Sequence, residues 1–351
     1  MWRTHEAQFW LRGERPEKPV RYDESAGLWH VYGYAEVQKI LAEPATFSSD
    51  VHRITPPHRR PRIGDREVSM DGMITLMDPP DHTILRKLIS SAFAPKVVYR
   101  LQPRIAALTH ELLDGANQDR MDFVETLAFP LPSIVVCEML GIPHEDRGLF
   151  QKWAAGMFER NNQPSQLEHS EEREREVETH AASLLQFRGY VAEHAERRRR
   201  KPREDLLTEL VESPLTDDQT VNFASALLIA GHLNTFMMLG NTVLCLDAFR
   251  DVQDRVRADR SGIPAVIEES MRYLTPFAAL SRATTREVEL GGETIPADQM
   301  LLVWVAAANR DPAVFTDPDT FDPGRDSRAH LSLGRGIHFC LGAMLARVEG
   351  E

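Results

Sequence analysis

The segment LGRGIHFCLG, residues 333–342, sets one cysteine, Cys340, among three glycines, an arginine and a histidine. A cysteine that binds a metal must be deprotonated, and the free N–H groups of a helix N-terminus stabilise a thiolate. Residues 341–349 are predicted to form a helix, which places Cys340 at its N-terminus. Glycines let a large group approach the backbone, and His338 can donate a hydrogen bond to an anionic cofactor edge. This chemistry indicates heme-thiolate ligation. The alternative is a buried structural cysteine beside a glycine turn.

Two further segments contain charged residues at positions that could form a structural network. In EESMRY, Glu269 and Arg272 lie three apart on a predicted helix, where the plain alternative is an exposed ion pair. In NRDPAVFTDPDTFDPGR, residues 309–325, Arg325 follows Pro318 and Phe321. A generic proline-rich loop is the alternative there.

In this order and with these gaps, the three segments resemble the cytochrome P450 family, and the resemblance covers nearly the whole chain from about residue 10. MDPPDHTILRKLISSAF, residues 77–93, and SRATT, residues 281–285, match two further family segments. AGHLNT, residues 230–235, stands where the family's central helix crosses above the iron.

The resemblance implies heme b as the cofactor and Cys340 as its axial iron ligand. It implies a charge network of Glu269, Arg272 and Arg325, which supports the proximal side and is structural. Four cations from separate segments would hold the two propionates, because buried anions need charged partners. The residues implied to contact heme are His82, Arg86, Arg282, His338, Gly334, Gly342, Leu333 and Ala230.

The central helix departs from the family pattern. The family has an acid followed by Thr, which help deliver protons during oxygen activation, but Leu233 and Asn234 stand at these positions. Thr235 comes one place later, about 100° around the helix. We take Asn234, Thr235 and His232 as candidate catalytic residues, because an amide hydrogen-bonds and histidine titrates near neutral pH. Three alternatives follow. Water or a substrate hydroxyl replaces the missing proton relay, or the reaction differs from simple hydroxylation, or the activity is lost.

Two other departures concern the proximal side. Leu333 stands where an aromatic residue normally shields the thiolate, and we expect a modest change in redox potential. Family members also continue beyond the cysteine helix into a β hairpin, whereas this sequence stops at Glu351. We expect either a fragment or a chain that lacks part of the pocket wall.

The resemblance also indicates where substrate and electron donor would bind. Substrate would contact Phe277, Ala278 and Leu280, together with Ala230, Asn234 and the loop before Leu76; plain core is the alternative for these apolar residues. No flavin or nicotinamide fingerprint is present, so electrons would come from a ferredoxin or flavodoxin with its reductase. Arg335 and Arg347 are candidate docking residues, and ordinary surface or propionate contact is their alternative.

Composition narrows the class of protein. The formal net charge is -12, which argues against nucleic-acid binding, and the run RRRRK at 197–201 is better explained as a solvated helix end. Three distant cysteines favour a reducing compartment over a disulfide framework, and no zinc spacing occurs. The charged N-terminus predicts no signal peptide. Residues 223–246 are apolar, but central polar residues favour a buried core helix over a membrane span.

The predicted elements are mostly helical. We expect a strand at 28–32 and helices at 34–41, 81–93, 103–113 and 130–140, with a loop at 51–75. A long helix should begin after Thr216, where Gln219 completes a capping box, and another should follow Pro264. Strands are expected at 283–290 and 300–305.

The sequence therefore predicts a mostly α protein with a small β region, a cytochrome P450 fold without the C-terminal hairpin, in a single domain of residues 1–351. We expect a cytoplasmic heme-thiolate monooxygenase that acts on a small organic substrate and binds neither nucleic acid nor membrane. A heme-thiolate enzyme that uses peroxide or catalyses a non-hydroxylating reaction is the second hypothesis. A non-enzymatic heme-binding protein is the third.

Overall fold

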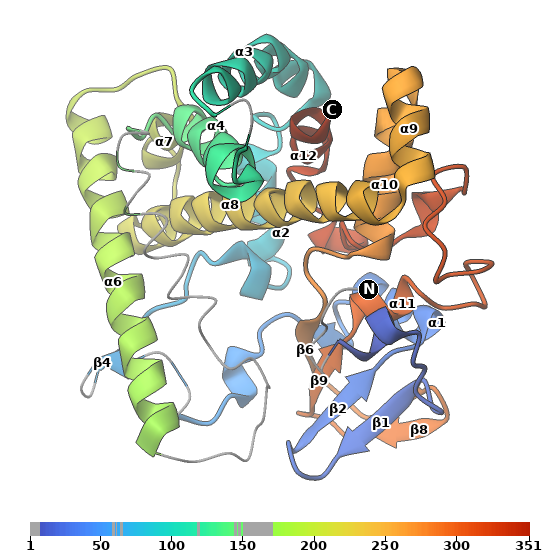
Figure 1. Cartoon of the computed structure of the whole chain (residues 1–351). Coiled ribbons are helices and arrows are strands. Elements are labelled where there is room, and N and C mark those ends of the chain that lie inside the picture. The colour runs from blue at the N-terminus through green and yellow to red at the C-terminus, as the bar shows by residue number, and fades with distance from the viewer. Residues whose placement is uncertain are drawn as a thin grey trace. The chain divides into compact units, whose positions relative to one another are not determined.

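The computed structural model describes residues 8–57, 60, 62–63, 66–117, 120–143, 146, 149 and 171–351 (Figure 1). The chain divides into two compact units, one formed by residues 1–48 and 234–351 and the other by residues 49–233. Each unit is described by itself.

A five-stranded sheet organises the first unit, in the order β1-β2-β9-β6-β3. Its strands are β1 (Val20–Asp23), β2 (Leu28–Val31), β3 (Phe47–Ser48), β6 (Leu280–Thr284) and β9 (Met300–Val303). β2 and β9 pair in parallel, and every other neighbouring pair is antiparallel. Val20, Val31, Leu301 and Val303 are fully buried in the core beside this sheet.

A hairpin follows β6 and explains one difference from the sequence prediction. Residues 283–290 were expected to form one strand, but β6 ends at Thr284 and β7 (Val288–Leu290) pairs only with β8 (Glu293–Ile295). Gly291 and Gly292 join β7 to β8 with φ of 57° and 82°. A two-residue hairpin turn needs positive φ at both central positions, which glycine adopts without strain.

The first unit contains the part of α8 (Asp217–Ala248) that follows Leu233, and its other described helices are short. They are α1 (Tyr34–Ala42), α9 (Arg250–Ala258), α10 (Ile263–Tyr273), α11 (Val305–Ala308) and α12 (Ala343–Gly350), with 3₁₀ turns η1 (Phe9–Arg12), η7 (Arg260–Gly262), η8 (Ser327–Ala329) and η9 (Gly336–His338). Pro264 lies in the first turn of α10, as predicted. The helix expected at 341–349 is confirmed as α12, which begins two residues later.

Helices dominate the second unit. They are α2 (Asp81–Ile89), α3 (Pro95–Asp114), α4 (Pro130–Leu140), α6 (Glu171–Arg200) and α7 (Leu206–Val211), with a π-turn η5 (Val124–Ala128) and 3₁₀ turns η2 (His52–Ile54) and η4 (Ile74–Leu76). The segment expected as a loop contains a small hairpin of β4 (Arg62–Ile63) and β5 (Arg66–Glu67). Nearly all of α4 is buried, because this helix is apolar on every face.

The long helix α8 (Asp217–Ala248) begins where the sequence predicted. The backbone N–H of Thr216 donates to Gln219 Oε1 at 3.0 Å, and the Gln219 N–H donates to Thr216 Oγ1 at 3.2 Å. These reciprocal bonds are a capping box. Among the described helices, α8 alone is long and apolar enough to cross a membrane by length and composition, yet 56% of that apolar window is buried inside the protein. Such burial is what a core helix requires.

Candidate functional site

The loop around Cys340 is closed by backbone hydrogen bonds. The Cys340 N–H donates to the Leu333 carbonyl at 2.7 Å, and the Gly334 N–H donates to the Leu331 carbonyl at 2.8 Å. Gly334 has a φ of 72°, a left-handed conformation that glycine adopts readily. Gly342 is the N-cap of α12, so Cys340 lies two residues before the N-cap of this helix. The expected placement of the thiol at a helix N-terminus is therefore present.

The three thiols differ in ways that bear on ligation. Burial raises the pKa of Cys137 and of Cys245 to about 12, so both remain neutral thiols in the core. Cys340 is half-exposed. A Cβ added at Gly342 would meet no described atom within 4 Å, so the chain leaves room at this residue, two positions after Cys340. An accessible thiol at a helix start, beside such room, fits a heme-thiolate ligand.

One glycine of this loop has a different reason from the one expected. Gly336 has a φ of 68°, and a Cβ there would stand 2.5 Å from the Leu41 carbonyl at the end of α1. Close contact within the protein therefore already requires glycine at this position.

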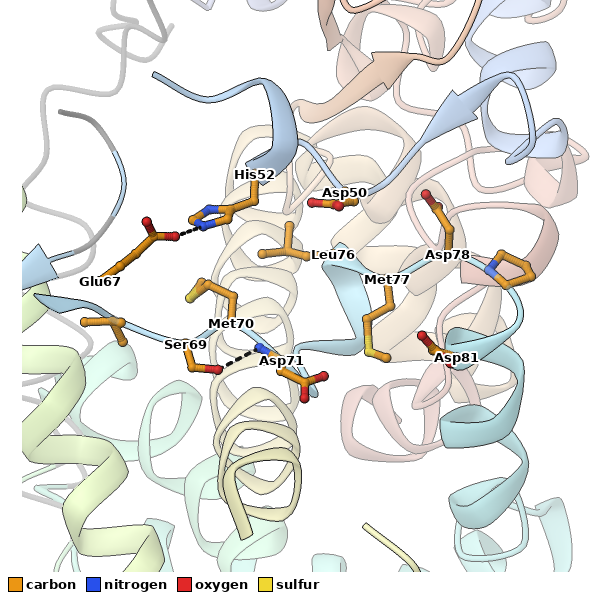
Figure 2. Close-up of a pocket in the computed structure, with 12 residues that line it drawn as sticks. Asp50, His52, Glu67, Ser69, Met70, Asp71, Leu76, Met77, Asp78 and Asp81 are labelled. Carbon is orange, nitrogen blue, oxygen red and sulfur yellow. Dashed lines mark hydrogen bonds and ion pairs between the residues drawn. The ribbon is translucent and has the colours of Figure 1, made fainter. Parts of the chain in front are cut away.

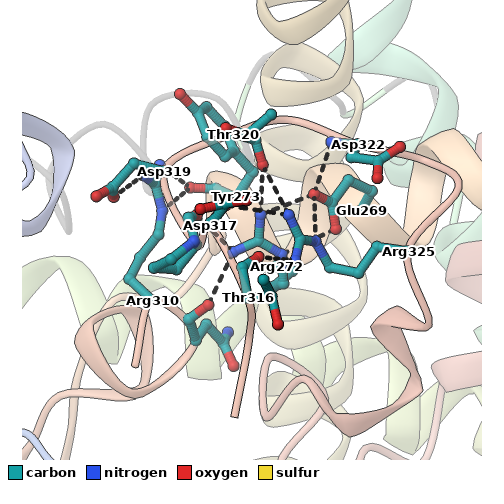
Figure 3. A network of polar contacts seen from close by, with 12 residues as sticks. Glu269, Arg272, Tyr273, Arg310, Thr316, Asp317, Asp319, Thr320, Asp322 and Arg325 are labelled. Atoms are coloured by element: carbon teal, nitrogen blue, oxygen red, sulfur yellow. Dashed lines mark hydrogen bonds and ion pairs between the residues drawn. The ribbon is translucent and has the colours of Figure 1, made fainter. Parts of the chain in front are cut away.

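The predicted charge network exists and is fully assembled within the first unit (Figure 3). Arg272 donates to Glu269 Oε2 through Nε at 2.8 Å and to Oε1 through Nη2 at 2.7 Å, and both side chains are fully buried. Arg325 Nε lies 3.4 Å from Glu269 Oε1, which also accepts the Asp322 N–H at 2.9 Å. A bidentate pair of this kind satisfies both partners, as burial demands.

Asn309, which the sequence reading left without a role, connects this network to the cysteine loop. Its carbonyl accepts from Arg272 Nη1 at 3.0 Å. Its side chain accepts the Leu331 N–H at 2.7 Å and donates to Ser332 Oγ at 2.8 Å. Asn309 is fully buried. The ion pair of α10 is therefore joined through one residue to the start of the loop that carries Cys340.

Arg310, beside it, was also missed. Its guanidinium donates to Asp319 Oδ1 at 2.9 Å and to the Tyr273 carbonyl at 2.7 Å, and lies 3.8 Å from the centre of the Tyr273 ring. The NRDP motif contained both residues, but only the tertiary contacts reveal their partners.

Arg347, a candidate docking residue, is held in an ion pair. Its guanidinium donates to Glu268 Oε1 through Nε at 2.6 Å and to Oε2 through Nη2 at 3.1 Å. His330 Nε2 lies 3.1 Å from the same carboxyl. Burial alone would raise the pKa of Glu268, but the hydrogen bonds to His330 and Arg347 outweigh it and lower the pKa to about 2. The charge of Arg347 is therefore engaged by Glu268, whereas Arg335 is exposed.

The predicted propionate partners fall in both units. In the first, Arg282 is buried on β6 and donates to the Ser281 carbonyl at 2.8 Å, and His338 lies half-buried in η9. In the second, His82 and Arg86 lie one turn apart on α2 and share a face. Burial, and secondarily the charge of Arg86, lower the pKa of His82. A neutral imidazole still donates one hydrogen bond to an anion.

The expected catalytic residues of α8 do not share one face. Ala230 and Asn234 are exposed, whereas His232, Leu233 and Thr235 are buried. Residues four apart point the same way on a helix, so Ala230 and Asn234 form one accessible stripe. The expected rotation of Thr235 away from Asn234 is therefore reflected in their burial.

His232 packs edge-on against Phe129, with ring centroids 4.2 Å apart. Burial lowers the pKa of His232 to about 4. The sequence suggested a residue that titrates near neutral pH, but a histidine with this pKa stays neutral there. It is therefore unsuited to supply a proton at neutral pH.

The expected substrate-contacting residues are accessible. Phe277 is 55% exposed, and Ala278 and Leu280 are half-buried. Within the second unit, a cavity of about 540 Å³ is lined by the segment before Leu76, which was also expected to contact substrate (Figure 2). Its lining residues come from three stretches of chain: Asp50, His52, Glu67, Val68, Ser69, Met70, Asp71, Leu76, Met77, Asp78, Pro79 and Asp81.

Comparison with known proteins gives consistent matches. Residues 31–351 match the family model described as Cytochrome P450. The chain is 41% identical to the cyclomarin C epoxidase of Salinispora arenicola, over 97% of this chain and 85% of that one. It is 39% identical to the erythromycin C-12 hydroxylase of Saccharopolyspora erythraea, over 97% and 84%. A solved structure titled for unusual cytochrome P450-like monooxygenases of microbial secondary metabolism has a TM-score of 0.91 and 46% identity, over 99% and 89%.

Proposed function

Because the chain belongs to the cytochrome P450 family and is a monooxygenase of that type, we propose that it inserts one oxygen atom of O2 into a small organic substrate. The observation that carries this proposal is the loop that presents Cys340. A half-exposed thiol stands at the start of α12, and Asn309 ties its loop to the buried pair of Glu269 and Arg272. Rigid support of a ligand loop is what a tuned metal ligand needs.

The cofactor of this proposal is heme b, which supplies oxygen activation when it is bound. Cys340 would hold the iron as a thiolate and donate electron density to it. His82, Arg86, Arg282 and His338 would neutralise the propionates, and Leu333, Gly334, Gly342 and Ala230 would contact the macrocycle. The whole chain, residues 1–351, would act as one heme-binding domain.

The chain's own residues set where substrate and water can go. Asn234 would hydrogen-bond to water or oxygen from the exposed stripe of α8, because its amide both donates and accepts. Phe277, Ala278 and Leu280 would exclude water from an apolar substrate. The relatives are named for epoxidation and hydroxylation of natural products, which supports a substrate from secondary metabolism.

The electron donor would be a ferredoxin or a flavodoxin with its reductase, in the cytoplasm of a bacterium. Arg335 is the candidate for docking an acidic partner, because it is exposed beside the cysteine loop. Arg347 is the weaker candidate, since its charge is engaged by Glu268.

A second function is favoured by one specific feature. Leu233 and Asn234 replace the acid and the alcohol that family members use for protons, and Leu233 carries no proton. Peroxide already brings the protons and electrons that O2 lacks. A peroxide-dependent or non-hydroxylating reaction would therefore tolerate this replacement.

Spectra and turnover test the proposal together. The purified protein should show the absorption of thiolate-ligated heme when reduced under CO. A compound that perturbs the ferric spectrum should then be oxidised with surrogate ferredoxin, reductase and O2. Turnover only with peroxide would favour the second function, and ligand-induced spectra without any turnover would favour a heme-binding protein.

A further inference from the structure

One side of the cavity in the second unit is attached to α8 by a buried side chain. We call residues 68–71 the cavity wall, because each of them lines the cavity (Figure 2). Asn222 on α8 is 2% exposed, and its Nδ2 donates to the Ser69 carbonyl at 3.1 Å and to the Asp71 carbonyl at 2.6 Å. One amide therefore holds the backbone of the wall at two points.

Gln219, one turn earlier on α8, provides a second attachment. Its Nε2 donates to Asp71 Oδ1 at 3.3 Å, while its Oε1 accepts the Thr216 N–H at the start of the helix. The same side-chain amide therefore caps α8 with its oxygen and binds the cavity wall with its nitrogen.

Gly72 shows how closely the chain approaches α8 directly after the wall. It has a φ of 89°, and a Cβ there would stand 2.6 Å from both the Cα and the carbonyl oxygen of Gln219. Both are backbone atoms, which cannot turn aside as a side chain can. Glycine is therefore required at this position by its conformation and by the contact.

Apolar contacts hold the first part of the wall against another helix. Val68 lies in a small buried cluster with Ala181 and Leu184 of α6, and Met70 packs against this cluster. These residues and those on α8 that bind the wall all belong to the second unit. The wall is therefore held to α6 by side chains and to α8 mainly by its backbone.

A fixed wall matters for ligand binding because order has to come from somewhere. A ligand that must first order a mobile segment loses affinity, since the ordering costs conformational entropy. A segment that the protein already holds in place presents its side chains to the ligand without this cost.

We propose that Asn222 is a positioning residue for substrate, which fixes the backbone of the cavity wall from α8 and so sets the shape of the cavity. The inference rests on the proposed function, in which the segment before Leu76 contacts substrate. Asn222 acts through Ser69 and Asp71, whose carbonyls it binds. Gln219 supports the same arrangement through the Asp71 side chain.

Hydrogen–deuterium exchange of the ferric, heme-loaded protein tests the attachment. Asn222→Asp keeps the shape of the side chain but replaces the donating amide with a carboxylate, which only accepts, so both bonds to the wall are lost. Exchange in peptides that cover residues 68–73 should become faster by about fivefold or more, because the segment loses its anchoring hydrogen bonds.

Gly72→Ala tests the attachment without a change in α8. The added Cβ would meet the Gln219 backbone and displace the chain that follows the wall. Peptides that cover residues 68–73 should again exchange faster than in wild type. This variant answers the question even if Asn222→Asp does not fold.

Two nitrogen ligands of ferric heme test the effect on binding. Imidazole and 4-phenylimidazole both bind iron through a ring nitrogen, and the second ligand brings an additional ring into the space for substrate. In Asn222→Asp and in Gly72→Ala, the dissociation constant of 4-phenylimidazole, measured from the ferric spectrum, should rise by about fivefold or more. That of imidazole should change less. A purely structural role would change both constants equally or change neither.

Asn241→Ala is the matched control. Asn241 is another amide of α8, and it donates to the Leu274 carbonyl at 2.8 Å, in the first unit. Its loss should leave the exchange of residues 68–73 and the ratio of the two dissociation constants as in wild type.

Two results would overturn the positioning role while the monooxygenase proposal stands. One is wild-type exchange of residues 68–73 in Asn222→Asp. The other is faster exchange with an unchanged ratio of the two dissociation constants. A wild-type protein without heme-thiolate spectra would instead overturn the proposed function, and this inference with it.

Discussion

Arg272 contacts both carboxylate oxygens of Glu269, at 2.8 and 2.7 Å, and solvent reaches neither side chain. Glu269→Gln would leave the guanidinium buried without its countercharge, and Arg325 would lose the same partner. Removing one member of a buried pair costs about 3–5 kcal/mol. We expect the free energy of unfolding, measured by urea titration of the holoprotein, to fall by that amount.

An exposed pair provides the control for this loss. Arg255 and Asp251 lie four apart on α9, with N and O atoms 3.6 Å apart and both side chains largely in solvent. Exposed pairs contribute little. Asp251→Asn should leave the urea midpoint nearly unchanged. Equal effects of the two substitutions would show that the buried network does not support the fold.

The lowered pKa of Glu268 predicts how the stability of the protein changes at acidic pH. Its pKa is about 2, below the ordinary 4.5, because hydrogen bonds to His330 and Arg347 outweigh the opposing effect of burial. A lowered carboxyl pKa contributes stability that is complete above pH 4.5 and is lost as pH falls towards 2. Glu268→Gln should be less stable at neutral pH, and its stability should vary less between these two pH values.

Asp326 is an exposed control for the pH-dependent stability predicted from Glu268. Hydrogen bonds from Arg328 lower the pKa of Asp326 to about 2 as well, but both side chains are exposed. Salt screens exposed charges far more than partly buried ones. Added salt should therefore erase any effect of Asp326→Asn and leave most of the effect of Glu268→Gln. If added salt erased the effects of both substitutions, the partly buried cluster of Glu268, His330 and Arg347 would not be protected from screening, contrary to this prediction.

Local signals in the sequence predicted the elements whose ends are fixed locally. The start of α8 follows from Thr216 and Gln219, which satisfy each other's N–H groups without help from the rest of the protein. α3 shows the limit of such signals. Pro103 was taken as its first residue, but the helix begins at Pro95 and contains Pro103 inside it. Pro95 and Pro103 both suit the first turn of a helix, so tertiary packing determines which of them begins α3.

The sequence alone did not predict which distant segments contact one another. Residues 283–290 have the composition of one strand, but Thr284 ends the pairing with β9 and β3, and the following residues pair with β8. Periodicity shows which residues face a core and does not name the partner strand. The same limit applies to burial, since the sequence gives no sign that Glu349 is only 6% exposed until its neighbours are placed.

Cys340→Ala should remove the thiolate signature from the reduced CO spectrum. The reason is chemical, because no other side chain of the cysteine loop can donate an anionic sulfur. Cys245→Ala is the control. That thiol is fully buried, with its pKa raised to about 12, so its loss should lower stability and leave the spectrum unchanged. An unchanged spectrum in Cys340→Ala would refute the ligand assignment.

Leu333→Phe should lower the reduction potential of the bound heme. The Leu333 carbonyl accepts the Cys340 N–H at 2.7 Å, so the backbone of residue 333 is held beside the ligand residue. A ring there would exclude water from the sulfur better than leucine does. Reduction adds a negative charge, and a drier site disfavours charge. Spectroelectrochemical titration measures the shift, and Ile337→Phe, in the same loop but farther along η9, should give a smaller one. An equal potential in Leu333→Phe and wild type would show that residue 333 does not tune the thiolate.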